Sequence, residues 1–208
     1  MPRRTTIYER LKWQWRRYQT RRAHLWSHRI TTDEHIRRGS YASGDRVLEG
    51  IEDWFRSQVP RHIDQLLDEL VHASSRIERS AAAQLLCWCS GRYDDRVIPA
   101  LIEAFGDRSH LVHNSAGRAL FPKLCRQRAV NIRPLVGLLQ HKHPLCQNKA
   151  AGIMAVLRLT PSQRRYIGKQ HGKLLYALAL GGRPHYVRRA STALALALAG
   201  VAVYKEID

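Results

Sequence analysis

Acidic residues are missing from nearly half of this chain. Between Arg108 and Lys205 there is no aspartate or glutamate, although the same stretch holds 17 lysines and arginines and six histidines. This half of the chain therefore cannot supply a carboxylate to a reaction. Uncompensated positive charge attracts polyanions, so the composition favours binding of an anionic partner over catalysis.

Other absences exclude further classes of protein. The longest apolar run, residues 193–204, is shorter than the roughly 20 residues that a membrane-spanning helix needs. The amino terminus lacks the apolar core of a secretory signal, although its arginine-rich, acid-poor character is similar to a mitochondrial presequence. The four cysteines have no paired C-x-x-C spacing, which indicates free thiols in a reducing compartment. We expect a cytoplasmic protein with no metal site and no cofactor.

The positive charge is concentrated toward both ends of the chain. Of the formal net charge of +18, residues 1–40 contribute 11 basic and 3 acidic side chains, residues 41–107 contribute 7 and 12, and residues 108–208 contribute 17 and 2. Arginine outnumbers lysine 28 to 7, which suits bidentate phosphate contacts but would also follow from an arginine-rich genome. Nucleic acid, an anionic membrane surface and an acidic protein are the partner classes that this distribution favours.

A degenerate repeat runs through residues 60–208. Segments 77–86, 111–120, 145–154 and 185–194 align without gaps, at offsets of 34, 34 and 40 residues. Each has two small residues, such as Ala82 and Ala83, and a large apolar residue such as Leu86 one helical turn later. A second apolar position repeats in step at Leu67, Leu101, Leu135 and Leu175. Each unit is therefore predicted to be two helices that bury their apolar faces by stacking on the next unit. The six extra residues of the fourth unit fall around 160–172 and predict additional helix.

This spacing of apolar and paired small residues resembles the HEAT-repeat family, particularly the short bacterial HEAT-like repeats also found in phycobilisome lyases. The resemblance covers about residues 60–200. It implies an all-α fold, an α-solenoid of about four helical-hairpin repeats over residues 60–208. It indicates architecture and not function, because such repeats serve many functions. The resemblance to phycobilisome lyases implies a tetrapyrrole or biliprotein ligand, but no residue here indicates a pigment site.

Residues 1–59 are predicted to be a helical extension that caps the first repeat within the same structural domain. Thr6 and Glu9 fit a capping box, and apolar residues then follow on one face of a helix from about Thr6 to His28. Its aromatic and basic residues could also contact a ligand: Trp13, Arg16, Arg17, Arg21 and Arg22. A second helix is expected over residues 45–57. Its acidic residues are expected on a solvated face: Glu49, Glu52 and Asp53.

The resemblance also implies where a ligand would bind, because the second helices of HEAT-like stacks usually line the concave surface. The predicted ligand-binding positions on these helices are Arg79, His113, Asn114, Arg118, Asn148, Lys149, Arg188 and Arg189. Basic residues at helix ends flank them: Lys123, Arg126, Arg128, Arg158, Arg164 and Arg165. Taken singly, a surface arginine is usually only solvated. As a set without carboxylates, these cations repel one another, and a bound polyanion would relieve that repulsion.

No catalytic residue is predicted. The chain contains no P-loop and no G-x-S-x-G sequence. It resembles HEAT-like alkylpurine DNA glycosylases in size, repeats and basicity, but those enzymes need aromatic side chains and an acid in the concave groove. The only tryptophan of the repeats is Trp88, which we expect in the core, and the nearest acids are Asp94 and Asp95. The repeated His-Glu pairs of deoxyhypusine hydroxylase are absent.

Two pairs of histidines occupy equivalent inter-helix turns. They are His110 with His113, and His141 with His143. Each pair could offer two imidazoles to a metal ion, but we expect these residues to be turn histidines without a metal.

The function that the sequence favours is non-enzymatic binding of a polyanion, most simply a nucleic acid backbone, through the basic concave face. One alternative is an adaptor or chaperone for an acidic protein partner, and another is a divergent alkylpurine DNA glycosylase. The apolar carboxyl-terminal helix further predicts that this end is covered, by self-association or by a partner, because terminal repeats normally have a polar outer face.

Overall fold

The computed structural model describes residues 6–26, 45–89, 91–126, 130–181 and 184–200, and for residues 23–26 and 125–126 it describes the backbone only. Every regular element within these ranges is a helix, which confirms the all-α prediction. The α-helices are α1 (Ile7–Trp26), α3 (Arg46–Gln58), α4 (Ile63–His72), α5 (Arg76–Leu85), α6 (Asp94–Glu103), α7 (His110–Arg126), α8 (Arg133–Gly137), α9 (Pro144–Val156), α10 (Pro161–Leu180) and α11 (His185–Leu198). Short 3-10 segments are η1 (Val59–His62), η2 (Leu86–Trp88), η3 (Gly91–Tyr93), η4 (Ala104–Gly106) and η5 (Leu138–Gln140).

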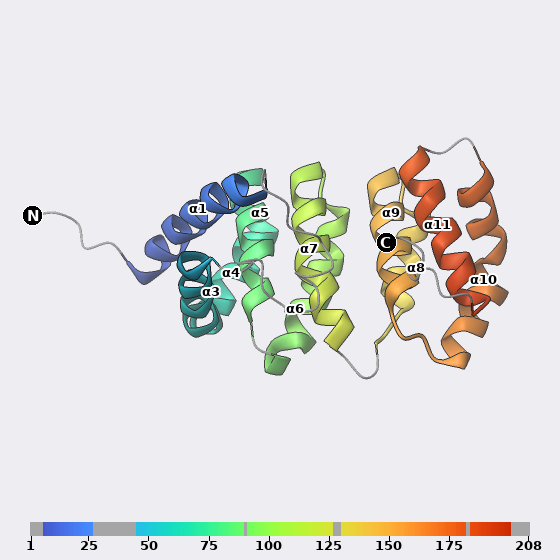
Figure 1. The fold of residues 1–208 in the computed structure, drawn as a ribbon, viewed down its shortest axis with the longest axis horizontal. Coiled ribbons are helices and arrows are strands. Elements are labelled where there is room, and N and C mark those ends of the chain that lie inside the picture. Colours follow the sequence, from blue (N-terminus) through green and yellow to red (C-terminus); the bar gives the residue numbers. More distant parts are fainter. Residues whose placement is uncertain (1–5, 27–44, 90, 127–129, 182–183, 201–208) are drawn as a thin grey trace, which may run out of the picture.

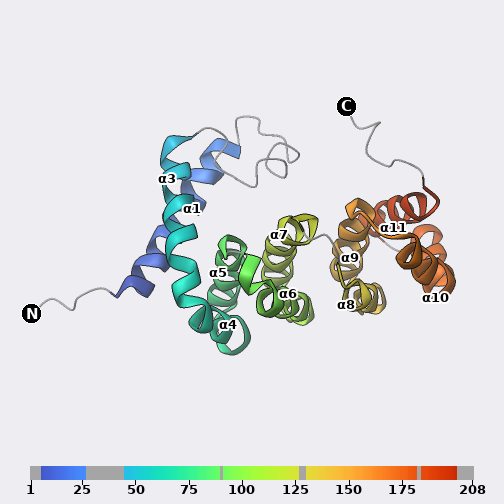
Figure 2. The ribbon, with the colours of Figure 1, turned by 90° about the horizontal axis from the view of Figure 1, so that it is seen from below.

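From α4 onward the helices form hairpins that lie side by side along the long axis of the molecule (Figure 1). The view from below separates them into two rows, with α4, α6, α8 and α10 in one row and α5, α7, α9 and α11 in the other (Figure 2). Each helix of the second row contacts the next helix of that row. The α7–α9 contact is less extensive than the α5–α7 and α9–α11 contacts.

The positions that define the sequence repeat form the core between the rows. The large apolar residue of every unit is fully buried: Leu86, Leu120, Met154 and Leu194. The small residues beside the neighbouring helices are buried too, except the half-buried Ala190: Ala82, Ala83, Ala116, Gly117, Ala150, Ala151 and Ser191. Small side chains at these places let successive second-row helices approach closely, which explains the repeat in physical terms.

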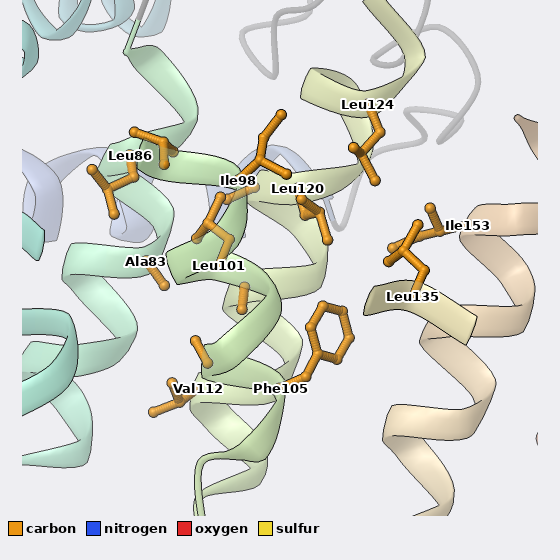
Figure 3. Close-up of a cluster of buried hydrophobic side chains, with 14 of the residues drawn as sticks. Ala83, Leu86, Ile98, Leu101, Phe105, Val112, Leu120, Leu124, Leu135 and Ile153 are labelled. Atoms are coloured by element: carbon orange, nitrogen blue, oxygen red, sulfur yellow. The ribbon is translucent and has the colours of Figure 1, made fainter. Parts of the chain in front are cut away.

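The core is continuous from one hairpin to the next. Leu86 of η2, Ile98 and Leu101 of α6, and Leu120 of α7 point into a shared apolar region (Figure 3). On the other side of α7, Leu135 and Ile153 belong to the next hairpin. Removing a leucine from such a region leaves a cavity, so each hairpin depends on its neighbours for stability.

The extra residues of the fourth unit lengthen α10, as predicted. This helix has 20 residues and begins with a complete capping box, in which the Thr160 side chain accepts from the backbone N–H of Gln163 and the Gln163 side chain accepts from that of Thr160. Gln163 also donates through Nε2 to the Val130 carbonyl at 2.7 Å, which ties the start of α10 to the segment before α8. The added turns therefore extend α10 at its amino-terminal end.

The amino-terminal extension packs its aromatic residues on the first hairpin. Trp15 and Tyr18 of α1 are buried, and their rings lie with those of Phe55 and Trp88 in a cluster with centroid separations of 4.8 to 6.1 Å. Trp88 is thus a core residue, as expected. Such a cluster supplies much buried area, so α1 covers this end of the stack.

The expectation that Glu52 lies on a solvated face is wrong. Its side chain is fully buried, accepts a hydrogen bond from the Tyr18 hydroxyl at 2.5 Å and pairs with Arg56 at 3.0 Å. Sequence reasoning missed this burial because α1 covers α3 only in the tertiary structure. Glu49 and Asp53 are exposed, as expected.

The other end of the stack exposes apolar side chains. On α10, Tyr176 and Leu180 are 69% and 65% exposed, and on α11 Leu196 is 41% exposed. The alternating apolar run is helical as far as Leu198, as expected, and residues 201–208 lie outside the described ranges. A search of the described helices finds none that is both long and apolar enough to cross a membrane.

Candidate anion-binding surface

Two of the predicted ligand-binding residues, Arg79 of α5 and His113 of α7, are buried against the turns that precede their helices. Arg79 forms a bidentate pair with Asp107, at 2.6 and 3.1 Å, and donates to the carbonyls of Ala73 and Ser74 at 2.7 and 3.0 Å. His113 lies 34 residues later, and its Nε2 contacts the Asp107 carbonyl. Both side chains are therefore engaged inside the protein.

The third unit repeats this arrangement with a different side chain. Gln147 lies a further 34 residues on and donates through Nε2 to the His141 carbonyl at 2.9 Å. Arg79, His113 and Gln147 each contact the carbonyl six residues earlier, at the turn between the two helices of the hairpin. This position, which we call the turn lock, satisfies a turn carbonyl in three successive units. Three different residue types fill it, so an alignment by residue identity does not reveal it.

Lys123, one of the predicted flanking residues, is also internal. It is 4% exposed, and its Nζ donates to the Cys89 carbonyl at 3.0 Å and to Asp94 Oδ1 at 2.9 Å. This contact joins α7 to the start of α6. The Asp94 carboxylate is therefore paired with a lysine, and the Trp88 side chain is buried. A base-excising enzyme would need an acid and aromatic side chains that are open to the groove.

In the first unit, the polar side chains of Ser80 and Gln84 on α5 are largely covered. Ser80 is buried against Ser115 at 2.7 Å, and Gln84 donates to the same Ser115 hydroxyl at 2.6 Å. Gln19 of α1 donates to Gln84 at 3.0 Å. The amino-terminal helix thus covers the second-row surface here, and any open surface begins at α7.

On α7 and α9 the predicted residues do come together. Asn114 and Arg118 of α7, and Asn148 and Lys149 of α9, are all partly exposed. Among the described residues, nothing hydrogen-bonds the side-chain amides of Asn114 and Asn148. These two amides and two cations therefore lie on adjacent second-row helices.

Lys149 occupies an unusual position within this group. Its stem lies over Gly117, where a Cβ atom would come within 3.1 Å of the Lys149 Cδ. Burial lowers the pKa of Lys149, and the neighbouring Arg118 cation lowers it further. No carboxylate in the described part of the chain pairs with Lys149. An anion held between Lys149 and Arg118 would offset both effects.

Other predicted cations lie farther along the molecule. Arg188 and Arg189 of α11 are exposed and continue the second row. Arg164 and Arg165 are exposed on α10, in the first row, and Arg158 is exposed in the segment before it. Arg128 and the side chain of Arg126 lie outside the described residues. The predicted set is therefore divided between two rows.

Of the predicted contact residues on the amino-terminal helix, some are exposed and others are paired or buried. Trp13 is 56% exposed with the Arg17 guanidinium 5.7 Å from its ring centroid, and Arg16 is also exposed. Arg21 pairs with Asp45 through bonds of 2.7 to 3.0 Å. Arg22 is 7% exposed and lines a small pocket with Arg118, Gln84 and Trp88. Two cations from separate elements thus meet where α1 ends over α5 and α7.

Another surface pocket lies elsewhere and has the opposite charge. Its lining is Tyr8, Gln65, Asp68, Glu69, His72 and Ala73. The Tyr8 hydroxyl donates to Glu69 at 2.6 Å, and Lys12 also contacts Glu69. Burial and the Glu69 carboxylate together raise the pKa of Tyr8. The carboxylates of this pocket make it unsuitable for a polyanion.

One grouping of residues was missed by sequence reasoning. The ligand atoms of His113, His143 and Cys146 lie within 4.8 Å of one another at the α7–α9 junction. Cys146 follows the turn histidine His143 by three residues. The spacing within that turn was a usable signal, but the approach of His113 depends on the stacking of α7 against α9.

No protein-family model matches this chain, and neither the curated proteins nor the solved structures include a significant match.

Proposed function

We propose that this protein binds a polyanion, with the backbone of a nucleic acid as its ligand, through the open surface of α7, α9 and α11. The observation that carries the proposal is the Arg118–Lys149 pair. Lys149 is a half-buried ammonium beside a second cation. Desolvation and repulsion both oppose a charged lysine at this place, and a bound phosphate compensates for both.

The neighbouring side chains suit phosphate contacts. Asn114 and Asn148 offer amide donors on the same two helices as the pair, and Arg188 and Arg189 extend the positive surface along the second row. Contacts of this kind position a backbone without reading its sequence. The proposed ligand is therefore recognised by charge and spacing.

For the architecture, we propose a HEAT-like α-solenoid. Its support is the sequence offsets of 34, 34 and 40, the buried small residues of the second-row helices, and the turn lock that recurs through three units. Each of these features recurs from unit to unit, as expected where similar hairpins stack on one another.

The test uses Lys149→Met, which keeps the length of the side chain over Gly117 and removes its charge. We expect fluorescence anisotropy with labelled single-stranded and duplex DNA and RNA to show several-fold weaker binding. The log-log salt slope should become shallower by about 0.9 for each phosphate that the variant no longer neutralises. Because the pKa of Lys149 is lowered in the folded state, its charge opposes folding at pH 7, so the variant should also unfold at a higher temperature.

The matched control is Lys169→Met, which makes the same chemical change at an exposed position of α10 in the first row. Equal losses of affinity in the two variants would show that net charge alone attracts the nucleic acid, and the proposed surface would be wrong. If the wild-type protein does not bind at physiological salt, an acidic protein becomes the partner to seek. A base-excision assay on alkylated duplex DNA separately tests the glycosylase alternative.

A further inference from the structure

The cluster of His113, His143 and Cys146 lies at the junction between α7 and α9. This contact is less extensive than the α5–α7 and α9–α11 contacts. Cys146 Sγ is 3.8 Å from His113 Nδ1 and 3.0 Å from the Phe105 carbonyl. The His143 ring centroid is 5.0 Å from that of His113, and the His141 ring is 6.3 Å from it. Three potential ligands from two hairpins thus converge on one point.

The other units provide an internal comparison for these residues. His143 immediately precedes the second helix of its hairpin. The equivalent position is Ser75 in the first unit and Ser109 in the second. The position of Cys146 is occupied by Val112 in the second unit. Serine is a preferred residue at a helix start and valine is an ordinary core residue, whereas histidine is not a favoured cap. The stack therefore does not require a histidine or a cysteine at these places.

The geometry of the cluster is close to that of a tetrahedral metal site. Typical zinc bonds to sulfur and nitrogen place those two ligand atoms about 3.6 Å apart. The observed separation of Cys146 Sγ and His113 Nδ1 is 3.8 Å. The third ligand atom is within 4.8 Å of both, so the His143 ring needs to move by about 1 Å to complete the set.

The hydrogen bonds around His113 leave the correct nitrogen available. Its Nε2 contacts the Asp107 carbonyl, which accepts the ring N–H, and Nδ1 then carries a lone pair toward Cys146. A ligating histidine commonly donates its other N–H to a backbone carbonyl in this way.

Binding would change the state of the other two ligands. Burial raises the pKa of the Cys146 thiol to about 11, so a metal ion must displace its proton to solvent as the metal–sulfur bond forms. His143 Nδ1 now accepts a hydrogen bond of 3.3 Å from the Leu145 N–H. If His143 coordinates through Nδ1, the metal takes this lone pair. If it coordinates through Nε2, the ring proton moves to Nδ1. In both cases Nδ1 can no longer accept from the Leu145 N–H, so this weak cap is lost.

We propose that His113, His143 and Cys146 form a metal site for one zinc ion, or another divalent ion that prefers imidazole and thiolate ligands, and that this ion clamps α7 to α9. Three protein ligands leave a fourth position for water or for the nearby His141. The site is independent of the polyanion surface, because none of its ligands belongs to the Arg118–Lys149 group.

The experiment is a Co²⁺ titration of the full-length, chelator-treated protein under reducing conditions, followed by Zn²⁺ competition. We expect one Co²⁺ per chain with a thiolate-to-metal charge-transfer band that Zn²⁺ abolishes. Cys146→Ser, which keeps a donor to Phe105, should lose the band because it removes the thiolate. His143→Ser, which restores the residue of the preceding units, should keep the thiolate band at saturating Co²⁺ but bind the ion at least about tenfold more weakly. Cys87→Ser is the control, because this partly exposed cysteine lies outside the cluster.

Circular dichroism and thermal unfolding of the metal-free variants show whether each remains folded, and His143→Ser should match the wild type in both. Zn²⁺ should raise the unfolding temperature of the wild type and of Cys87→Ser but not of the other two variants. A band that survives in folded Cys146→Ser, or an unchanged Co²⁺ affinity in folded His143→Ser, would overturn the assignment. Failure of the wild type to take up one equivalent would also overturn it.

Discussion

The turn lock of the first unit gives the sharpest quantitative prediction, because its ion pair is buried and has an exposed counterpart in the same protein. The side chains of Arg79 and Asp107 are 7% and 11% exposed. Hydrogen bonding to Asp107 raises the pKa of Arg79. Burial alone would raise the pKa of Asp107, but the hydrogen bonds from Arg79 and the Ser109 N–H outweigh it and the pKa is lowered. The pair is therefore charged at neutral pH.

The perturbation is Asp107→Asn, which keeps the shape of the side chain and removes its charge. The guanidinium of Arg79 then remains buried without a carboxylate, and the amide can accept only through one oxygen. Removing one partner of a buried pair typically costs about 3 to 5 kcal/mol. We take the lower end, about 3 kcal/mol, because the two backbone carbonyls of Ala73 and Ser74 still accept from Arg79.

The matched control is Asp64→Asn, which breaks the pair between Asp64 and Arg96. This pair is as short, at 2.5 Å, but its side chains are 81% and 47% exposed. Solvent screens exposed pairs, so this variant should lose much less stability than Asp107→Asn. The two variants change the net charge equally and differ in burial.

The assay is urea and thermal unfolding of the wild type and both variants, with circular dichroism as the signal. In a domain of this size, each kcal/mol shifts the unfolding temperature by about 2 to 4 °C. We therefore expect Asp107→Asn to unfold about 6 to 12 °C below the wild type and Asp64→Asn only a few degrees below it. Losses that agree within about 0.5 kcal/mol would refute the argument that burial makes the Arg79–Asp107 pair important.

Three further predictions concern other parts of the fold. Tyr18→Phe removes the hydrogen bond to the buried Glu52 and should cost about 1 to 3 kcal/mol in urea unfolding, whereas Tyr176→Phe, at an exposed ring, should cost almost nothing. Gly117→Ala should displace the stem of Lys149 and weaken polyanion binding in the anisotropy assay, and unchanged affinity would mean that Lys149 adjusts without loss. If the exposed apolar end drives self-association, Leu180→Glu should lower the mass measured by light scattering at high protein concentration; a wild-type protein that is monomeric throughout would contradict this prediction.

Much of the fold was predictable because stacking imposes a period on the sequence. The small residues near Ala82 and the large residue equivalent to Leu86 recur at the offsets found in the sequence, and the structure buries them. The capping boxes at Thr6 and Thr160 also depend on neighbours three residues away. Local patterns of this kind can be read without knowing the tertiary structure.

The binding residues were predicted less well, because the type of a side chain does not reveal its partner. The sequence treats Arg79 and Arg118 alike, as cations on second-row helices. In the structure, Arg79 meets Asp107, whereas Arg118 lies beside Lys149. The distant carboxylate makes Arg79 part of the fold, a role that its residue type alone does not reveal.

The sequence by itself determined the all-helical class, the hairpin period and the absence of carboxylates from nearly half of the chain, since these follow from composition and from spacing along a helix. Only the tertiary structure decided which polar groups are internal. The burial of Glu52 under α1, the ion pair between Arg79 and Asp107 and the meeting of His113 with Cys146 each require residues at least 28 positions apart to come into contact. Those contacts arise from how the helices stack, and helical periodicity alone does not specify them.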